Sequence, residues 1–354
     1  MANINTYIRK YKNKSFEEEP FNEVDNLIFS SLVYLNFDGI IPNNKKYVTL
    51  NDAGKIFLNQ NTYLNVSKYG IAHMVSYGIL KSIVDTVRYK DILVYNYFYI
   101  GDINKQFGAM CFKVKKNFIY VAFEGTDNLL SGWKEDFQMA YEFPVPSQKH
   151  AINYLNKNIS FFDKNVIVGG HSKGGNLALV ACMYCKKYIR KKIKLIYSND
   201  GPGLRKAQME SVNYKSIRDR YIHIIPNYCY VGILLRNDKY KVIKSSRRGV
   251  FAHSLSTWQI DDNKLKESEL SNISKNLEES VIMWLDKHDD LKREKMIITI
   301  FNALEESGIY DINDFGNIKK IIMVIKYLKN IDQETKDLVL GFIHFNFNYL
   351  LENM

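Results

Sequence analysis

Residues 164–175 read Lys-Asn-Val-Ile-Val-Gly-Gly-His-Ser-Lys-Gly-Gly, a short apolar run that leads directly into a glycine-rich turn around Ser172. The segment Gly170-His171-Ser172-Lys173-Gly174 fits the pattern G-x-S-x-G. In this pattern the glycines make room for a sharp turn between a strand and a helix, and the serine oxygen is exposed at the helix N-terminus. We therefore predict a strand over 164–168, a nucleophilic Ser172, and a helix through about Lys187. The alternative is a glycine-rich turn that only closes a βα unit.

Further strands are predicted on both sides of this turn. Apolar runs at 193–197 and 221–225 follow it, separated by helix-like intervals, which is typical of a parallel sheet covered on both faces. Three aromatic and β-branched runs precede it, at 92–100, 107–114 and 118–123, and they predict an antiparallel meander. Apolar residues at helical spacing predict two earlier helices, over 22–35 and 68–87. The fold class expected is α/β, with a mostly parallel sheet and helices on both faces.

The C-terminal part of the chain changes in character after Ile260, where the predicted strands end. We place a domain boundary near residue 261, which gives an α/β domain over 1–261 and a helical region over 262–354. This region has its own apolar periodicity and no catalytic candidate, so we expect it to pack beside the sheet without lining the floor of the pocket. Its predicted helices cover 277–287, 293–307, 318–329 and 334–351.

Charge and cysteine content limit the partners and the compartment. The net charge of +11 in 354 residues favours contact with anionic surfaces, including a peripheral contact with an anionic membrane. Lys and Arg are spread along the chain without a nucleic-acid motif, so we expect no nucleic-acid partner. The N-terminus has no apolar signal core, and Cys182-x-x-Cys185 falls several turns into a predicted helix, where a thiol is not activated. We expect a cytoplasmic protein with packed thiols and no metal or organic cofactor.

The general base is expected to be a histidine that follows the nucleophile in sequence. His253 lies in a loop after a predicted strand over 240–244, and it is the best candidate. His223 falls inside a strand, and His171 is expected to support the turn.

A carboxylate usually orients such a base. Asp200 closes the strand 193–197 at the carboxyl edge of the sheet, where ligand-facing residues gather. Asp238, in a predicted hairpin turn, and the absence of any carboxylate remain as alternatives.

The oxyanion of an acyl-transfer reaction needs two hydrogen-bond donors. We expect one from the backbone N–H of Lys173 and the other from Thr126, which follows a strand end. Gly125 lets the backbone approach a substrate closely. Leu129 and Leu130, next in the chain, are expected to contact an acyl chain unless they only pack in the core.

Two segments resemble class-3 lipases. Phe123-Glu124-Gly125-Thr126, followed by Trp133 and Asp136, resembles their F-R-G-T and W…D segment, and Gly170 to Gly175 resembles their G-H-S-L-G-G turn. Over roughly residues 15–300 the chain is similar to a bacterial family of lipase-like α/β-hydrolases. The resemblance implies a class-3-lipase-like fold and a Ser–His pair.

Three departures separate the chain from those lipases. Glu124 replaces Arg, Lys173 replaces an apolar residue and adds a positive charge near the acyl site, and Ile225-Pro226-Asn227 lacks the usual acid.

The function predicted from these residues is hydrolysis of a carboxylic ester, of a lipid or an acylated small molecule, through an acyl-enzyme. An alternative is a pseudo-hydrolase that binds an acyl ligand or a protein partner, with an anionic membrane surface as a place of contact. The oligomeric state is left open.

Overall fold

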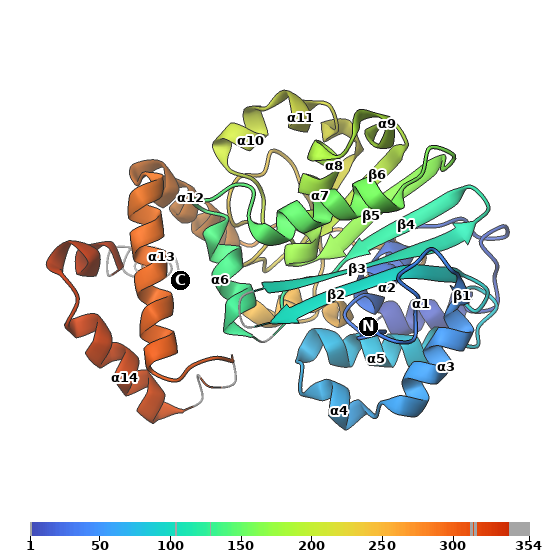
Figure 1. The fold of residues 1–354 in the computed structure, drawn as a ribbon, viewed down its shortest axis with the longest axis horizontal. Helices are drawn as coiled ribbons and strands as arrows, with labels where there is room; N and C mark the ends of the chain where they lie inside the picture. Colours follow the sequence, from blue (N-terminus) through green and yellow to red (C-terminus); the bar gives the residue numbers. More distant parts are fainter. Residues whose placement is uncertain (1, 103–104, 128, 312–313, 315–316, 340–354) are drawn as a thin grey trace.

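A single eight-stranded sheet forms the centre of the computed structural model, which describes residues 2–102, 105–127, 129–311, 314 and 317–339 (Figure 1). The strands lie in sequence order from β1 to β8. Neighbours from β1 to β4 are antiparallel, and neighbours from β4 to β8 are parallel. The strands are β1 Val48–Thr49, β2 Leu93–Asp102, β3 Lys105–Lys115, β4 Phe118–Phe123, β5 Asn165–His171, β6 Ile193–Asn199, β7 Tyr221–Pro226 and β8 Lys241–Ile243.

Helices cover both faces of the sheet (Figure 1). Strand β4 shows why: Tyr120 and Ala122 belong to one apolar cluster, while Val121 and Phe123 belong to the other, as the period of two in a strand requires. The first cluster includes residues of α1, α2 and α5, and the second includes residues of α7 and α8. The helices up to β7 are α1 Ile4–Tyr11, α2 Glu23–Leu32, α3 Leu50–Gln60, α4 Tyr63–Ser67, α5 Ile71–Ile83, α6 Leu130–Gln138, α7 Pro146–Asn158, α8 Lys173–Tyr184, α9 Lys187–Arg190, α10 Lys206–Glu210 and α11 Val212–Lys215.

Element boundaries differ from the predicted ones where local chemistry interrupts a pattern. The helix predicted over 68–87 is shorter than expected and corresponds to α5, Ile71–Ile83, because Gly70 just before it has a φ of 110° that does not fit a helix. Helix α8 ends at Tyr184, so Cys185 is its C-cap. All four cysteines are free and buried.

The C-terminal helices stand beside the sheet, next to α6 (Figure 1). The prediction that strands end at Ile260 is wrong, because β9 Ile260–Asp261 and β10 Lys264–Leu265 form a hairpin whose turn contains the predicted boundary. The helix expected over 334–351 extends outside the described residues. Helices α12 Asn272–Lys287, α13 Asp290–Glu306 and α14 Ile318–Lys329 follow the hairpin.

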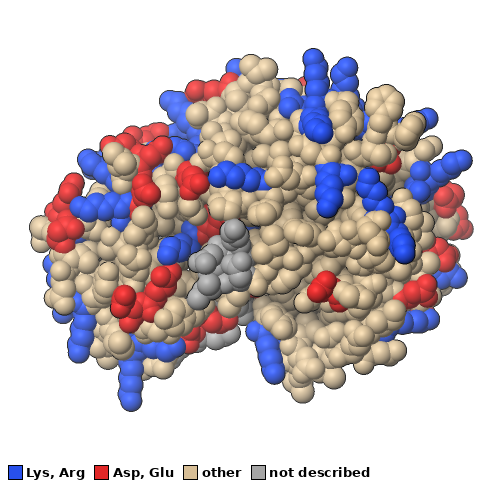
Figure 2. All heavy atoms as spheres, viewed as in Figure 1, with Lys and Arg blue, Asp and Glu red and all other residues tan. Residues whose placement is uncertain are grey.

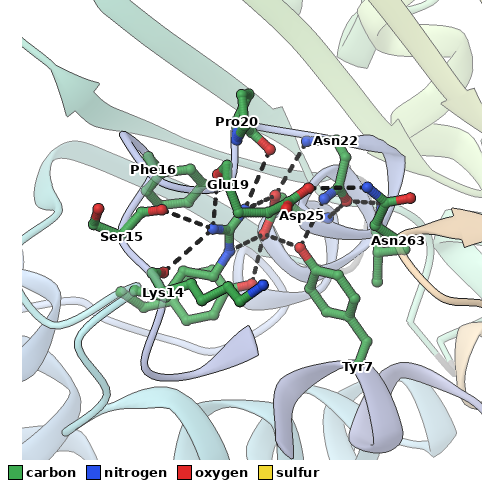
Figure 3. Close-up of polar contacts among 12 residues, drawn as sticks. Tyr7, Lys14, Ser15, Phe16, Glu19, Pro20, Asn22, Asp25 and Asn263 are labelled. Atoms are coloured by element: carbon green, nitrogen blue, oxygen red, sulfur yellow. Dashed lines mark hydrogen bonds and ion pairs between the residues drawn. The ribbon is translucent and has the colours of Figure 1, made fainter. Parts of the chain in front are cut away.

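A buried ion pair fastens the N-terminal segment to the rest of the fold (Figure 3). The guanidinium of Arg88 contacts both carboxylate oxygens of Asp25, at 3.0 and 2.6 Å, and also donates to the backbone O of Glu19 at 2.9 Å. The hydroxyls of Tyr7 and Tyr89 donate to the same carboxylate. Because every oxygen of Asp25 has several donors, this buried charge is fully compensated.

The sheet order, the covered faces and the strand–turn–helix at Ser172 confirm the expected fold class, an α/β-hydrolase-type fold. Among the described residues, no helix is both long and apolar enough to cross a lipid bilayer.

Candidate active site

Ser172 lies in the sharp turn between β5 and α8. Its backbone has φ 58° and ψ −134°, a region that residues other than glycine rarely adopt and that often marks functional sites. A Cβ on Gly174 would lie 2.1 Å from the backbone O of Phe123, so only glycine fits beside β4. The turn predicted from the sequence is therefore present, and it leaves Ser172 9% exposed at the start of a helix.

His253 and Asp200 form a hydrogen-bonded pair. His253 closes the 3₁₀ turn Gly249–His253, and Asp200 follows the last residue of β6 with a φ of 54°. Nδ1 of His253 lies 2.6 Å from Oδ2 of Asp200. In a neutral imidazole this bond places the proton on Nδ1 and leaves Nε2 free to accept one.

Asp200 is held in place by a second set of donors. Its Oδ1 accepts the backbone N–H of Gly232 and the thiol of Cys229, each at 2.9 Å. Burial acts to raise the pKa of Asp200, but the nearby His253 and these hydrogen bonds bring the pKa below its ordinary value. The carboxylate is therefore ionised at neutral pH. Sequence reasoning missed the loop around Cys229 and Gly232, because nothing local in it marks a carboxylate site.

Other candidates for base and acid lie elsewhere. Asp238 accepts the hydroxyl of Tyr214 at 2.7 Å and pairs with Arg218. His223 is buried in β7, where burial lowers its pKa to about 4. Of the two carboxylates left open by the sequence, Asp200 is the one that contacts His253.

Ser172 and His253 are close in the fold without a direct bond. The ring of His171, which precedes Ser172, lies 4.5 Å from the ring of His253 between centroids. Within the described residues, no hydrogen bond joins the Ser172 hydroxyl to the His253 ring. Such bonds are often long in unliganded hydrolases and tighten when substrate binds.

The segment expected to bind the oxyanion lies against the nucleophile. A Cβ on Gly125 would be 2.9 Å from Cβ of Ser172, so this glycine allows the close approach. The hydroxyl of Thr126 donates to Oδ2 of Asp136 at 2.5 Å. Burial raises the pKa of Asp136 to about 6, although Lys173 and the Thr126 hydrogen bond act against the rise. The other oxygen of Asp136 has no hydrogen-bond partner among the described residues.

The side chain of Lys173 points into the protein interior. It is 1% exposed, and its Nζ lies 3.3 Å from Oε2 of Glu135. The positive charge expected near the acyl site is therefore paired with a carboxylate. The backbone N–H of Lys173 remains a suitable donor, because the first N–H groups of a helix have no helical acceptor. Glu124, where the lipases have Arg, is fully buried, and burial raises its pKa well above the ordinary value.

A small apolar cavity of about 120 Å³ opens beside Ser172. Helices α12 and α13 of the C-terminal region form one of its walls. They reach it because α6, which follows the oxyanion segment, packs on them in a shared apolar cluster. That this region does not line the floor of the pocket stays a prediction. The walls include Trp133, Asp136 and Phe137 of α6, and Val281, Trp284, Leu285, Met296 and Ile297 of α12 and α13.

Leu129 and Leu130 lie outside the described lining of this cavity. Leu130 is 5% exposed and packs in the cluster shared by α6 and α13, since its position at the start of α6 turns it toward those helices. Leu129 is 40% exposed and pairs with Asp311 through a β-bridge.

A second, larger cavity of about 410 Å³ lies on the His253 side of the site. His171, Arg247 and Phe251 contribute to its lining. In the described part of the chain, no three His, Cys, Asp or Glu side chains come together as a metal site would require.

Comparison with known proteins gives a family and similar solved structures. The chain is similar to the crystal structure of M37 lipase, with 16% identity over 60% of this chain and 70% of that chain, at a TM-score of 0.36. No curated protein matches the sequence. The sequence profile of the Mbeg1-like family, a lipase-like family, matches residues 83–302, which is more than half of the chain. The chain therefore belongs to the Mbeg1-like family.

Proposed function

We propose that this protein is a serine hydrolase that cleaves esters of short carboxylic acids through an acyl-enzyme on Ser172. The observation that carries the proposal is the 2.6 Å contact between Nδ1 of His253 and Oδ2 of Asp200, close to a serine in a strained turn. The lipase-like family and the α/β-hydrolase-type fold support the same reaction class.

In the proposed reaction, Oγ of Ser172 attacks the ester carbonyl carbon while Nε2 of His253 accepts its proton. The negative charge on the carbonyl oxygen is stabilised by the backbone N–H of Lys173 and by Thr126. The bond to the alcohol breaks, and the alcohol leaves with the proton from His253. A water molecule, deprotonated by His253, then attacks the acyl-enzyme. The bond between the acyl carbon and Oγ of Ser172 breaks, Oγ takes the proton back from His253, and the acid is released.

The size of the cavity beside Ser172 supports a short acyl group. A dry cavity of about 150 Å³ holds one benzene molecule. The cavity here is about 120 Å³ and is walled by apolar side chains, so it suits a chain of about four to six carbons. Met296 and Ile297 of α13 are among the side chains that enclose this volume.

Covalent labelling tests the reaction class. A fluorophosphonate is expected to label the wild-type protein and Ser82→Ala, which changes an exposed serine of α5, but not Ser172→Ala. Hydrolysis of p-nitrophenyl butyrate should fall at least about 10³-fold in Ser172→Ala. A wild-type protein that binds hexanoate but is not labelled would contradict the proposal and favour the pseudo-hydrolase alternative.

Chain length tests the substrate class. Across p-nitrophenyl esters from two to twelve carbons, kcat/KM should be highest at four to six and at least about tenfold lower at ten. Ile297→Ala, which opens the cavity wall, should shift the optimum to longer chains. Ile298→Ala, the same change at a 38% exposed position of α13, should leave the optimum in place. Activity that depends on Ser172 but rises steadily to twelve carbons would reject the short-acyl assignment and leave the serine-hydrolase proposal standing.

A further inference from the structure

Two adjacent phenylalanines are the most exposed aromatic side chains near β5. Phe161 and Phe162 are 75% and 85% exposed, in the loop between α7 and β5. Their rings contact each other edge to face at 5.9 Å, and Phe161 also lies 6.4 Å from the ring of Tyr188 on α9. Leaving two apolar rings in water is costly, so this exposure indicates a binding surface.

Positive charge surrounds these rings. Asp163 is the single acidic residue between positions 156 and 194. Lys192 holds the loop by donating to the backbone O of Ser160 at 3.2 Å and of Asp163 at 2.7 Å, with its Nζ 5.2 Å from the ring centroid of Phe161. Six more lysines of this segment are exposed and in no ion pair within the described residues: Lys157, Lys164, Lys186, Lys187, Lys191 and Lys194. Figure 2 shows Lys and Arg side chains projecting over the region of α7 to α9, with few acidic side chains among them.

We propose that this aromatic–lysine surface, made of Phe161, Phe162, Tyr188 and the six lysines, docks the protein on an anionic lipid bilayer. Phe rings at a loop tip insert into the boundary between headgroups and acyl chains, while lysines around them are attracted to anionic headgroups. Neither the inserted rings nor the lysine charges alone give stable membrane binding, and this surface has both.

The composition of the surface favours lipid over nucleic acid. Bidentate recognition of phosphate in nucleic acids favours the planar fork of arginine over lysine. Arg190, the one arginine of this segment, already donates to Asn213, Ser216 and the backbone O of Cys185. The unpaired cations are lysines, which act as point charges without a fixed geometry.

Docking here would leave the candidate active site in water. The loop precedes Asn165, the first residue of β5, whereas Ser172 follows the last. Seven strand residues separate the two ends by roughly 20 Å. The proposal therefore goes beyond the proposed esterase activity and does not depend on it. Membrane contact should not be needed for hydrolysis of a water-soluble ester.

Sedimentation of the full-length protein with vesicles tests the proposal. We expect binding to vesicles of 70% phosphatidylcholine and 30% phosphatidylserine, weak binding to phosphatidylcholine alone, and release when salt rises from 0.1 to about 0.5 M. Phe161→Ala/Phe162→Ala should weaken binding at least about tenfold. Each lysine near an anionic membrane surface contributes at most roughly fivefold to the binding affinity. Lys187→Gln/Lys191→Gln should therefore weaken binding by a factor similar to that of the phenylalanine variant.

Matched variants at other surfaces serve as controls. Phe251→Ala changes a phenylalanine that is 63% exposed on the His253 side of the site, and Lys45→Gln/Lys46→Gln removes two exposed lysines elsewhere. Both should bind like the wild type. Loss of binding in Phe251→Ala but not in Phe161→Ala/Phe162→Ala would overturn the proposal, because it would place docking at the active-site mouth. Failure to bind phosphatidylserine vesicles, with tight binding of a single-stranded oligonucleotide instead, would also overturn it.

Discussion

Nε2 of His171 lies 2.9 Å from the backbone O of His253, so the residue before Ser172 holds the loop of the candidate base. A carbonyl oxygen can only accept a hydrogen bond, so Nε2 carries the proton. Nδ1, 3.0 Å from the hydroxyl of Tyr34, then accepts from it. Burial and the neighbouring His253 lower the pKa of His171 to about 3, which keeps the ring neutral in this role.

Replacement of His171 should therefore impair turnover more than folding. In His171→Phe both ring bonds are lost, the loop of His253 is free to move, and kcat should fall about 10- to 100-fold. His171→Gln retains an N–H donor and should recover part of that loss. Steady-state kinetics with p-nitrophenyl butyrate, beside a thermal melt, checks both variants. An unchanged kcat in His171→Phe would show that the loop is held by other contacts.

Asp200→Asn should lower kcat by about 10⁴-fold with the fold intact, because an amide favours the wrong tautomer of His253. Asp238→Asn is the matched control, since Asp238 bonds Tyr214 and Arg218 instead of the histidine. It should keep near-normal turnover. If Asp200→Asn lost only about 1 kcal/mol of stability and kept its activity, Asp200 would be a turn-capping residue.

Asp136 predicts a pH dependence of stability. Its pKa is about 6 in the folded protein and 3.8 in the reference state, so the folded state binds more protons between about pH 4 and 6. The free energy of unfolding contributed by this group therefore falls as pH rises through that window, by about 3 kcal/mol in total. Asp136→Asn should remove this contribution. Urea unfolding from pH 4 to 7 should show the variant gaining relative to the wild type as pH rises, and a constant difference would contradict the pKa.

The ion pair of Arg88 and Asp25 should be essential for the N-terminal segment (Figure 3). Arg88→Met leaves a buried carboxylate without its cation and should cost about 3–5 kcal/mol. Arg88→Met/Asp25→Asn should cost less than the two single changes together, because no buried charge is left unpaired. Chemical denaturation measures all three variants. Additive losses would show that the two side chains stabilise the fold independently.

Local patterns were enough to predict the architecture and to single out Ser172, Asp200 and His253 as candidate site residues. Continuous apolar and β-branched runs predict the strands, because a strand covered by helices on both faces buries the side chains of both faces. The glycines around Ser172 predict the sharp turn, because no larger residue fits there: a Cβ on Gly170 would lie 2.3 Å from the backbone of Gly174. Asp200 and His253 were found because parallel strands end at one edge of a sheet, so residues after different strands meet there.

The surroundings of the site residues were decided only by the tertiary structure, because they depend on contacts between segments that are distant in the sequence. Helices α12 and α13 wall the cavity beside Ser172, although their periodicity indicates only that one face is buried and not against what. The N–H of Gly232 and the thiol of Cys229 reach Asp200 because a loop folds back over the sheet edge. The orientation of His171 follows from the position of the His253 carbonyl, 82 residues away. The sequence by itself therefore determined the fold class and the candidate site residues. Long-range packing decided what surrounds them, because neighbours across a fold leave no local periodic signal.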